Sequence, residues 1–427
     1  MKDVRIWKQE LREGAHAARL ASLYCCAPED TAPQAARYAA ALDGLEAAFG
    51  PHSAAALFSA PGRTEIGGNH TDHQHGRVLA GSVNIDMIAA AGPNGLNQLR
   101  VQSEGYPLCA ISLDDLAPRK EEENSSAAIL RGECAAFAQR GARLSGLDVY
   151  VTSNVPKGSG VSSSAAYEVL IGTILNELFM SEKVSPIAIA QIGQWTENVY
   201  FGKPCGLMDQ MASSVGGLVA IDFGGLEAQV ESMKYDFAAK GLRLCVVQAG
   251  GDHENLTAEY AAIPAEMRAV ARALGGEVLR DIAPEALLKA IPSLKNRVPD
   301  RAILRALHFM DEDARVAAAF EALKKDDLGE FLRLVIASGE SSWKLLQNVY
   351  VAGSDNREMA LALELSRRML EGRGAWRIHG GGFGGTILAF VPEDMLAAYQ
   401  REMNSVFGEN ACVPLDVRPV GAVRIEL

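Results

Sequence analysis

The chain lacks the features that mark several large classes of protein. No run of about 18 apolar residues occurs, so no membrane span is expected. The first 26 residues have no continuous apolar stretch and are not expected to act as a signal peptide. Seven cysteines form no CxxC pair, and an odd number of scattered thiols is typical of reduced cysteines in a cytoplasmic protein. We therefore expect a cytoplasmic location and no membrane partner.

Basic charge is scarce as well. The 41 lysines and arginines are outnumbered by 53 aspartates and glutamates, which gives a net charge of −12. A nucleic-acid-binding protein usually carries a basic excess or a basic face, so nucleic acid is not an expected partner. The chain is long, with 427 residues, and 48% of them are apolar. A chain of this size can bury a large core without disulfides.

The order of the predicted elements indicates an α+β fold. Strand-like and helical segments are mixed without a regular strand–helix–strand rhythm, which favours α+β layers over a doubly wound sheet. After about residue 255 the sequence is mostly helical, and this change predicts two lobes, 1–238 and 239–427. Helical spacing in residues 5–24 and 34–48 predicts a helical cap at the N-terminus.

Four segments carry residues suited to chemistry. The sharpest lies between a predicted strand and a predicted helix and reads Pro156-Lys157-Gly158-Ser159-Gly160-Val161-Ser162-Ser163-Ser164-Ala165-Ala166. Small side chains let an anion approach the backbone, and the helix start presents free N–H groups and the positive end of its dipole. The segment matches neither the Walker A nor the dinucleotide-binding pattern. It predicts an anion-binding loop, with a serine-capped helix start as the simpler alternative.

The second segment, residues 61–76, gathers polar side chains between two strand-like runs. A polyol substrate would need such a set, because each hydroxyl requires a donor or an acceptor. The polar set is Arg63, Asn69, His70 and Asp72. The rival interpretation is a metal site, and its ligands would be His70, Asp72, His73 and His75. That interpretation is weaker, because residues this close in a loop rarely all face one ion.

The third and fourth segments are shorter. Asp209 lies within Cys205-Gly206-Leu207-Met208-Asp209-Gln210, where a buried, unpaired carboxylate would be costly, so it is either paired or used as a base. Taken alone, the segment favours a structural capping role for Asp209. The run Gly380-Gly381-Gly382-Phe383-Gly384-Gly385 precedes a strand-like segment. Alone it is a flexible turn, and its glycines also allow a loop to approach phosphates or another loop closely.

Together and in this order, the four segments resemble the motifs of the GHMP small-molecule kinases, and most of all those of the galactokinases. The family pattern Gly-Arg-Val-Asn-Leu-Ile-Gly-Glu-His-Thr-Asp-Tyr corresponds to residues 62–73, and Pro-x-Gly-x-Gly-Leu-Ser-Ser-Ser-Ala corresponds to 156–165. Pro-Cys-Gly-Ile-Met-Asp-Gln corresponds to 204–210, and the glycine-rich run is unchanged. The resemblance extends from about residue 49 to the C-terminus.

The resemblance implies a two-lobed GHMP kinase fold with the active site in the cleft between the lobes, and it implies ATP and Mg²⁺. By this resemblance Ser164 and Glu197 bind the metal ion, and Asp209 faces the C1 hydroxyl of a sugar with Arg63 beside it. The residues that match sugar-contacting positions are Asn69, His70, Asp72, Gly206 and Tyr260. Those that match the ATP-binding loop are Gly158, Ser159, Gly160, Val161, Ser162, Ser163, Ser164 and Ala165.

Three departures from the family pattern bear on specificity. The Glu of the first motif is Asn69 here, and an amide donates as well as accepts, so the hydroxyl preference can change. The Asn-Leu-Ile of that motif is Glu65-Ile66-Gly67. The Trp-x-x-Tyr-Val-x-Gly near the nucleotide base is Ser-Ala-Ala-Ile-Leu-Arg-Gly at 126–132, which removes the aromatic residues expected to stack on adenine.

We therefore predict a monomeric, ATP- and Mg²⁺-dependent kinase that phosphorylates galactose at its C1 hydroxyl and releases galactose 1-phosphate and ADP. A kinase of the same family that acts on another hexose or an amino sugar is the nearest alternative. A non-catalytic sugar sensor is the second, and the retention of Arg63, Glu197, Asp209 and the full serine loop argues against it. A metal-dependent hydrolase built on the histidines is the most distant.

Overall fold

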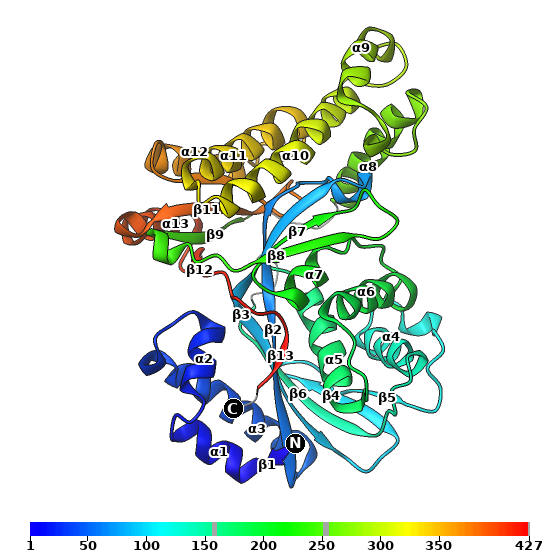
Figure 1. The fold of residues 1–427 in the computed structure, drawn as a ribbon, viewed down its shortest axis with the longest axis vertical. Coiled ribbons are helices and arrows are strands. Elements are labelled where there is room, and N and C mark those ends of the chain that lie inside the picture. The colour runs from blue at the N-terminus through cyan, green and yellow to red at the C-terminus, as the bar shows by residue number, and fades with distance from the viewer. Residues whose placement is uncertain (156–159, 251–255, 426–427) are drawn as a thin grey trace.

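The computed structural model describes residues 1–155, 160–250 and 256–425 (Figure 1). Within these residues one sheet has nine strands, in the order β1-β2-β3-β6-β4-β5, with β13 also paired to β2, β7 to β3 and β8 to β7. All neighbours are antiparallel except β4 and β6. The strands are β1 (Lys2–Asp3), β2 (Ala54–Gly67), β3 (Arg77–Pro93), β4 (Gln98–Ser103), β5 (Cys109–Ser112), β6 (Leu147–Ser153), β7 (Leu218–Asp222), β8 (Gln229–Met233) and β13 (Val423–Arg424).

Helices cover both faces of this sheet, because its central strands are apolar on both sides. Ala56 and Phe58 of β2 pack in a cluster with α4 (Ser126–Gln139), α5 (Ser163–Phe179) and α6 (Pro186–Thr196), and α7 (Met208–Val215) lies beside them. Ala55 and Leu57, which point the opposite way, pack against α1 (Val4–Arg12), α2 (Ala17–Tyr24) and α3 (Ala32–Phe49). Figure 1 shows the two groups on opposite sides of the sheet, so the N-terminal helices form the cap expected from their spacing.

The second sheet has four antiparallel strands in the described residues, in the order β10-β11-β9-β12. They are β9 (Leu242–Gly250), β10 (Ala375–His379), β11 (Gly385–Pro392) and β12 (Cys412–Leu415). One face packs on α12 (Glu358–Leu370) and α13 (Leu396–Phe407), and the other packs on α10 (Asp300–Lys324) and α11 (Leu328–Ser341). Beyond α10 lie α8 (Thr257–Ala273) and α9 (Pro284–Leu294), which share a core with it.

The two sheets meet along one apolar core. Ile66 and Val83 of the first sheet join Val246 and Phe390 of the second in the same buried cluster. The change of sheet falls between β8 and β9, but the chain returns to the first sheet at β13. Just before β13, the fully buried Arg418 donates to Ser59 at 2.6 Å and to Asp86 at 3.4 Å. The predicted α+β class is confirmed, whereas the boundary between 238 and 239 stays a prediction.

One strand differs in length from its prediction. The apolar run at residues 56–60 predicts a short strand that ends before Pro61, whereas β2 continues to Gly67. Register shifts between Pro61 and Arg63, and again between Glu65 and Gly67, admit these residues into the strand, since bulges tolerate Pro and Gly. The first half of the polar segment 61–76 is therefore strand and not loop. No helix among the described residues is long and apolar enough to cross a membrane.

Candidate active site

The serine loop joins β6 to α5 and lies against β2. Gly158 and Ser159 fall outside the described residues, so the structure places the loop from Gly160 onward. The backbone turns through the left-handed region at Gly160 (φ 72°) and at Ser162 (φ 59°), the residue before α5. Val161 is buried, and its carbonyl accepts from the backbone N–H of Arg63 at 3.0 Å. The start of α5 is thereby fixed next to the strand that carries Arg63.

Asp209 lies in the first turn of α7 and faces this loop. Its two carboxylate oxygens accept from Arg63 Nε at 2.7 Å and Arg63 Nη2 at 2.9 Å, and Oδ2 also accepts from Ser162 Oγ at 2.5 Å. Arg63 Nη1 donates in addition to the Gly160 carbonyl. Burial would raise the pKa of Asp209, but the charge and hydrogen bonds of Arg63 and the Ser162 hydroxyl outweigh it and lower the pKa. The carboxylate is therefore ionised, and its side chain remains 30% exposed.

Asp72 and Gly206 lie next to this carboxylate. Asp72 begins the short helical turn η2 (Asp72–Gln74), and its Oδ1 accepts from the His73 N–H at 2.8 Å. A Cβ at position 206 would lie 2.2 Å from Asp72 Oδ2, so any larger residue there would displace the Asp72 carboxylate. Burial raises the pKa of Asp72, the charge of His70 opposes the rise, and the negative charge of Asp209 adds to it.

Three further sugar-site candidates contact the glycine-rich loop between β10 and β11. Asn69 donates to the Gly380 carbonyl at 2.8 Å, His70 Nε2 bonds the Gly381 carbonyl at 2.9 Å, and Tyr260 Oη donates to the Gly382 carbonyl at 2.8 Å. The predicted fourth motif thus approaches another loop, the second of the two roles expected for its glycines. Both polar atoms of the Asn69 side chain are fully hydrogen-bonded within the protein.

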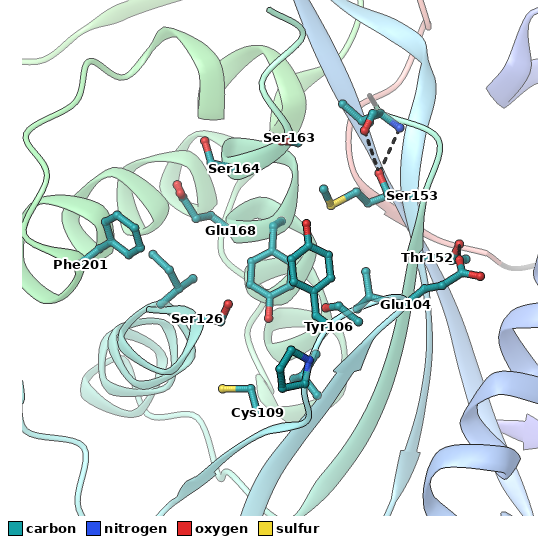
Figure 2. Close-up of a pocket in the computed structure, with 18 of the residues that line it drawn as sticks. Glu104, Tyr106, Cys109, Ser126, Thr152, Ser153, Ser163, Ser164, Glu168 and Phe201 are labelled. Carbon is teal, nitrogen blue, oxygen red and sulfur yellow. Dashed lines mark hydrogen bonds between the residues drawn. The ribbon is translucent and has the colours of Figure 1, made fainter. Parts of the chain in front are cut away.

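A cavity of about 480 Å³ opens beside the start of α5 (Figure 2). Ser163, Ser164 and Glu168 line it from α5, and Glu197 lines it from the helical turn η4 (Glu197–Phe201). The positions of the missing family aromatics, Ser126 and Ile129, also line it. Aromatic side chains enter from elsewhere, and they are Tyr106, Tyr167 and Phe201.

Two buried carboxylates converge at one end of this cavity. Gln210 Nε2 donates to Glu168 Oε2 at 2.9 Å and to Glu197 Oε2 at 3.2 Å. Burial and the charge of Glu197 raise the pKa of Glu168 well above its usual value. Among the residues that the structure describes, no group of three or more His, Cys, Asp or Glu side chains forms a ready metal site. Oxygen ligands facing each other near Ser164 are nevertheless the chemistry that Mg²⁺ prefers.

Sequence reasoning did not single out Glu168, Gln210 or Tyr106. Glu168 could have been found, because it lies four residues after Ser164 in the same helix and so shares its face. Gln210 follows Asp209 directly, and only the fold reveals that its amide spans two carboxylates. Tyr106 comes from the connection between β4 and β5, and no local pattern links it to the serine loop.

Two family models match parts of this chain, and several solved structures share its fold. Residues 128–217 match the model of the GHMP kinases N terminal domain, and residues 45–93 match the galactokinase galactose-binding signature. The galactokinase of Lactococcus lactis, solved with galactose, is similar with a TM-score of 0.76 and 22% identity over 90% of this chain and 98% of that chain. The mevalonate kinase of Methanococcus jannaschii is similar with a TM-score of 0.61 and 14% identity, over 86% of this chain and 99% of that chain.

A third structure widens the range of substrates in this fold. A D-glycero-D-manno-heptose 1-phosphate kinase from Bacteroides thetaiotaomicron has a TM-score of 0.58 and 15% identity, over 88% of this chain and 99% of that chain. The chain thus shares the fold of these kinases, and two of its segments match models of the GHMP kinases and of the galactokinases. Within that group, the predicted resemblance to the galactokinases is confirmed by the galactose-binding signature and by the Lactococcus structure.

Proposed function

We propose that this protein is a sugar kinase that transfers the γ-phosphoryl group of ATP to the C1 hydroxyl of galactose, giving galactose 1-phosphate and ADP. The observation that carries the proposal is the contact of Asp209 with both Arg63 and Ser162. It joins the carboxylate of α7, the arginine of the sugar motif (residues 62–73) and the serine loop within one hydrogen-bonded unit. A sugar hydroxyl at Asp209 would therefore lie beside the loop that cradles the phosphates.

The charges at this point suit phosphoryl transfer. The transition state needs alignment and charge neutralisation more than covalent help from the protein. Arg63 neutralises Asp209 in the free protein and is near enough to the loop to stabilise charge on the transferring group. Because its pKa is low, Asp209 orients the hydroxyl and accepts its proton late, as the new bond to phosphorus forms.

The cavity beside α5 supports a nucleotide site of the kind that GHMP kinases use for ATP. Its volume lies in the range of small-molecule sites. The first turn of α5 supplies N–H groups and the hydroxyls of Ser163 and Ser164 for phosphate oxygens. Ser164 and Glu197 would hold Mg²⁺, with Glu168 next to them, and the ion would neutralise phosphate charge.

The adenine end of the cavity departs from the family. Ser126 and Ile129 replace the expected aromatic residues, so the base would contact Tyr106, Tyr167 and Phe201 instead. Figure 2 shows the Tyr106 ring within the cavity, between the serines of α5 and Cys109. Aromatic faces at this place suit a planar base, because stacking needs a flat apolar surface and not a particular residue.

On the sugar side, Asp72, His70 and Tyr260 supply polar atoms, and Gly206 leaves room beside Asp72. The lack of the family's Glu at position 69 favours a second candidate, a kinase for another hexose or an amino sugar. The experiment that decides is ADP release coupled to a sugar panel. Turnover with galactose above all other sugars is expected, and binding of a sugar without turnover of any would establish the sensor instead.

A further inference from the structure

Asn69 lies where the sugar motif of the first sheet meets the glycine-rich loop of the second. It is 1% exposed. Its Nδ2 donates to Glu65 Oε1 at 3.1 Å and to the Gly380 carbonyl at 2.8 Å, while Oδ1 accepts from Asn348 Nδ2 at 2.8 Å and from Ser342 Oγ at 3.4 Å. A carboxamide has two N–H donors and one oxygen with two lone pairs. Every polar position of this side chain is therefore used within the protein.

The partners also decide which way the amide points. Nδ2 faces a carboxylate oxygen of Glu65 and a backbone carbonyl, and both are acceptors only. A rotated amide would turn its own oxygen toward them and leave buried acceptors without donors, which is costly. A sugar hydroxyl can reach Asn69 only by displacing one of these four bonds.

The residue types at positions 65 and 69 are those of the family motif in exchanged order. The motif has Asn at the first position and Glu at the second, whereas this chain has Glu65 and Asn69. Here the carboxylate at 65 is paired with the fully buried Arg377 of β10, whose Nη2 donates to Glu65 Oε1 at 3.1 Å. Losing that carboxylate would leave the buried guanidinium without its hydrogen-bonded counter-ion. Position 69, which faces the same carboxylate, must then be a donor.

The contact of Asn69 is the first of three in a row. The consecutive carbonyls of Gly380, Gly381 and Gly382 accept from Asn69, His70 and Tyr260. The loop that fastens Asn69 thus also holds the two residues assigned to sugar binding. His70 adopts a left-handed backbone conformation (φ 57°), which a non-glycine residue keeps only where its surroundings enforce it.

We propose that Asn69 is a positioning residue and not a sugar ligand, and that Glu65 and Asn69 form a reciprocal carboxylate–amide pair. This pair fastens the sugar motif to the glycine-rich loop, so that His70 and Tyr260 are in place before the sugar arrives. The inference rests on the proposed function and deepens it. Polar recognition of the sugar then falls to Asp72, His70 and Tyr260, without a group at position 69.

The first test compares Asn69→Ala with the wild type on galactose and on its 2-, 3-, 4- and 6-deoxy analogues. A positioning residue lowers kcat/KM by a similar factor, about tenfold or more, for every sugar, while the KM for ATP changes by less than about twofold. For an analogue without turnover, the inhibition constant is compared. If Asn69→Ala and the wild type have equal kcat/KM for one deoxy analogue only, Asn69 binds the hydroxyl that this analogue lacks, and the proposal is wrong.

A matched control is Asn176→Ala, a buried asparagine near the far end of α5 that bonds the backbone of Val184. It is expected to lower the unfolding temperature in a similar way and to leave kcat/KM for the sugars within about twofold. Equal losses of kcat/KM in both variants would assign the effect of Asn69→Ala to general destabilisation, against the proposal.

The second test needs no activity. Asn69→Glu brings a second carboxylate against Glu65 and lowers the unfolding temperature, and Glu65→Gln alone also lowers it by depriving Arg377 of its partner. In the reciprocal pair, adding Glu65→Gln to Asn69→Glu raises the unfolding temperature again. If the decreases in unfolding temperature of the two single variants add up in the double variant, the two residues are not coupled and the proposal is wrong. If the wild type phosphorylates no sugar, the proposed function fails, while this cycle still decides whether the two residues are coupled.

Discussion

The proposed sugar side and the proposed nucleotide side of the site are built differently. On the sugar side, Asn69, His70 and Tyr260 are each hydrogen-bonded to the glycine-rich loop, and Asp209 is bonded to Arg63 and Ser162. On the nucleotide side, a cavity of about 480 Å³ is lined by hydroxyls, aromatic rings and the carboxylates of Glu168 and Glu197. The sugar side is a connected polar network, and the nucleotide side is a shaped cavity.

This difference explains how the two sides depart from the family pattern. In a connected network one change forces another, so the Glu-to-Asn change at 69 comes with an Asn-to-Glu change at 65. In a shaped cavity, different elements can supply the same apolar lining. The family's aromatic residues are absent at 126 and 129, and the aromatic lining here comes from Tyr106, Tyr167 and Phe201. We expect coupled effects of mutation on the first side and separable effects on the second.

The largest effect is expected for Asp209→Ala. The variant loses the group that orients the hydroxyl and receives its proton, so kcat should fall by about 10²–10⁴-fold, while the Kd for ATP stays close to that of the wild type. Coupled ADP release and nucleotide titration measure the two quantities. Asp222→Asn is the control, because Asp222 is also paired with arginines, Arg77 and Arg280, but lies outside the site. Unchanged turnover of Asp209→Ala would remove Asp209 from the mechanism.

A smaller effect is expected at the carboxylates of the cavity. Glu197→Gln should raise the Mg²⁺ concentration for half-maximal rate by about 10- to 100-fold, with Glu168→Gln shifting it in the same direction by less. The matching shift in Mg²⁺-dependent ATP binding provides a readout without turnover. Glu133→Gln is the control, since burial and Glu168 raise the pKa of Glu133 well above its usual value and an amide resembles the protonated acid. A shift as large in the control would argue against a metal site here.

Tyr106→Ala should weaken the binding of ATP and leave the binding of the sugar unchanged. Loss of a stacking face raises the KM for ATP by about 5- to 50-fold and leaves kcat and the KM for galactose nearly unchanged. Tyr106→Phe keeps the ring and should retain most of the ATP affinity. Initial-rate kinetics with each substrate varied in turn separates the two constants. An equal rise in both KM values would show that the two sides are not separable in this way.

The smallest effect is expected at His73, whose Nε2 is buried without a hydrogen-bond partner. Burial, with the charges of His70 and Arg268, lowers its pKa to about 3. The unfolded chain binds a proton there near pH 6.5 and the folded chain does not, so stability is lost as the pH falls from about 6.5 toward 3. His73→Phe should flatten the pH dependence of the free energy of unfolding in this window, measured by urea denaturation.

The effect of His73→Phe on stability is to be compared with its effect on turnover at neutral pH. We expect His73→Phe to change kcat by less than about twofold, because no step assigned above uses this ring. A large loss of turnover that added Zn²⁺ or Mg²⁺ modulates would instead favour the metal interpretation of the histidines.

Much of this arrangement follows from local sequence. Three segments predict their own local conformation: the small residues before α5, the polar run that begins in β2 and the glycine run before β11. Their order along the chain is the basis of the family resemblance. The extension of β2 to Gly67 was missed, because bulges around Pro61 and Gly67 depend on pairing with β3. Tyr106 and the Asn69–Gly380 contact were missed for a similar reason, since both join elements that only the tertiary fold brings together.

The return of the chain to the first sheet bears on how the protein is made. Arg418 bonds Ser59, 359 residues earlier, and with Arg37 it neutralises the fully buried Asp86. On the ribosome, β2 and β3 emerge long before this arginine, so the nascent first sheet carries a carboxylate that still lacks one of its two counter-charges. We therefore expect the strand that bears Arg63 to reach its full stability only after residue 418 has been synthesised.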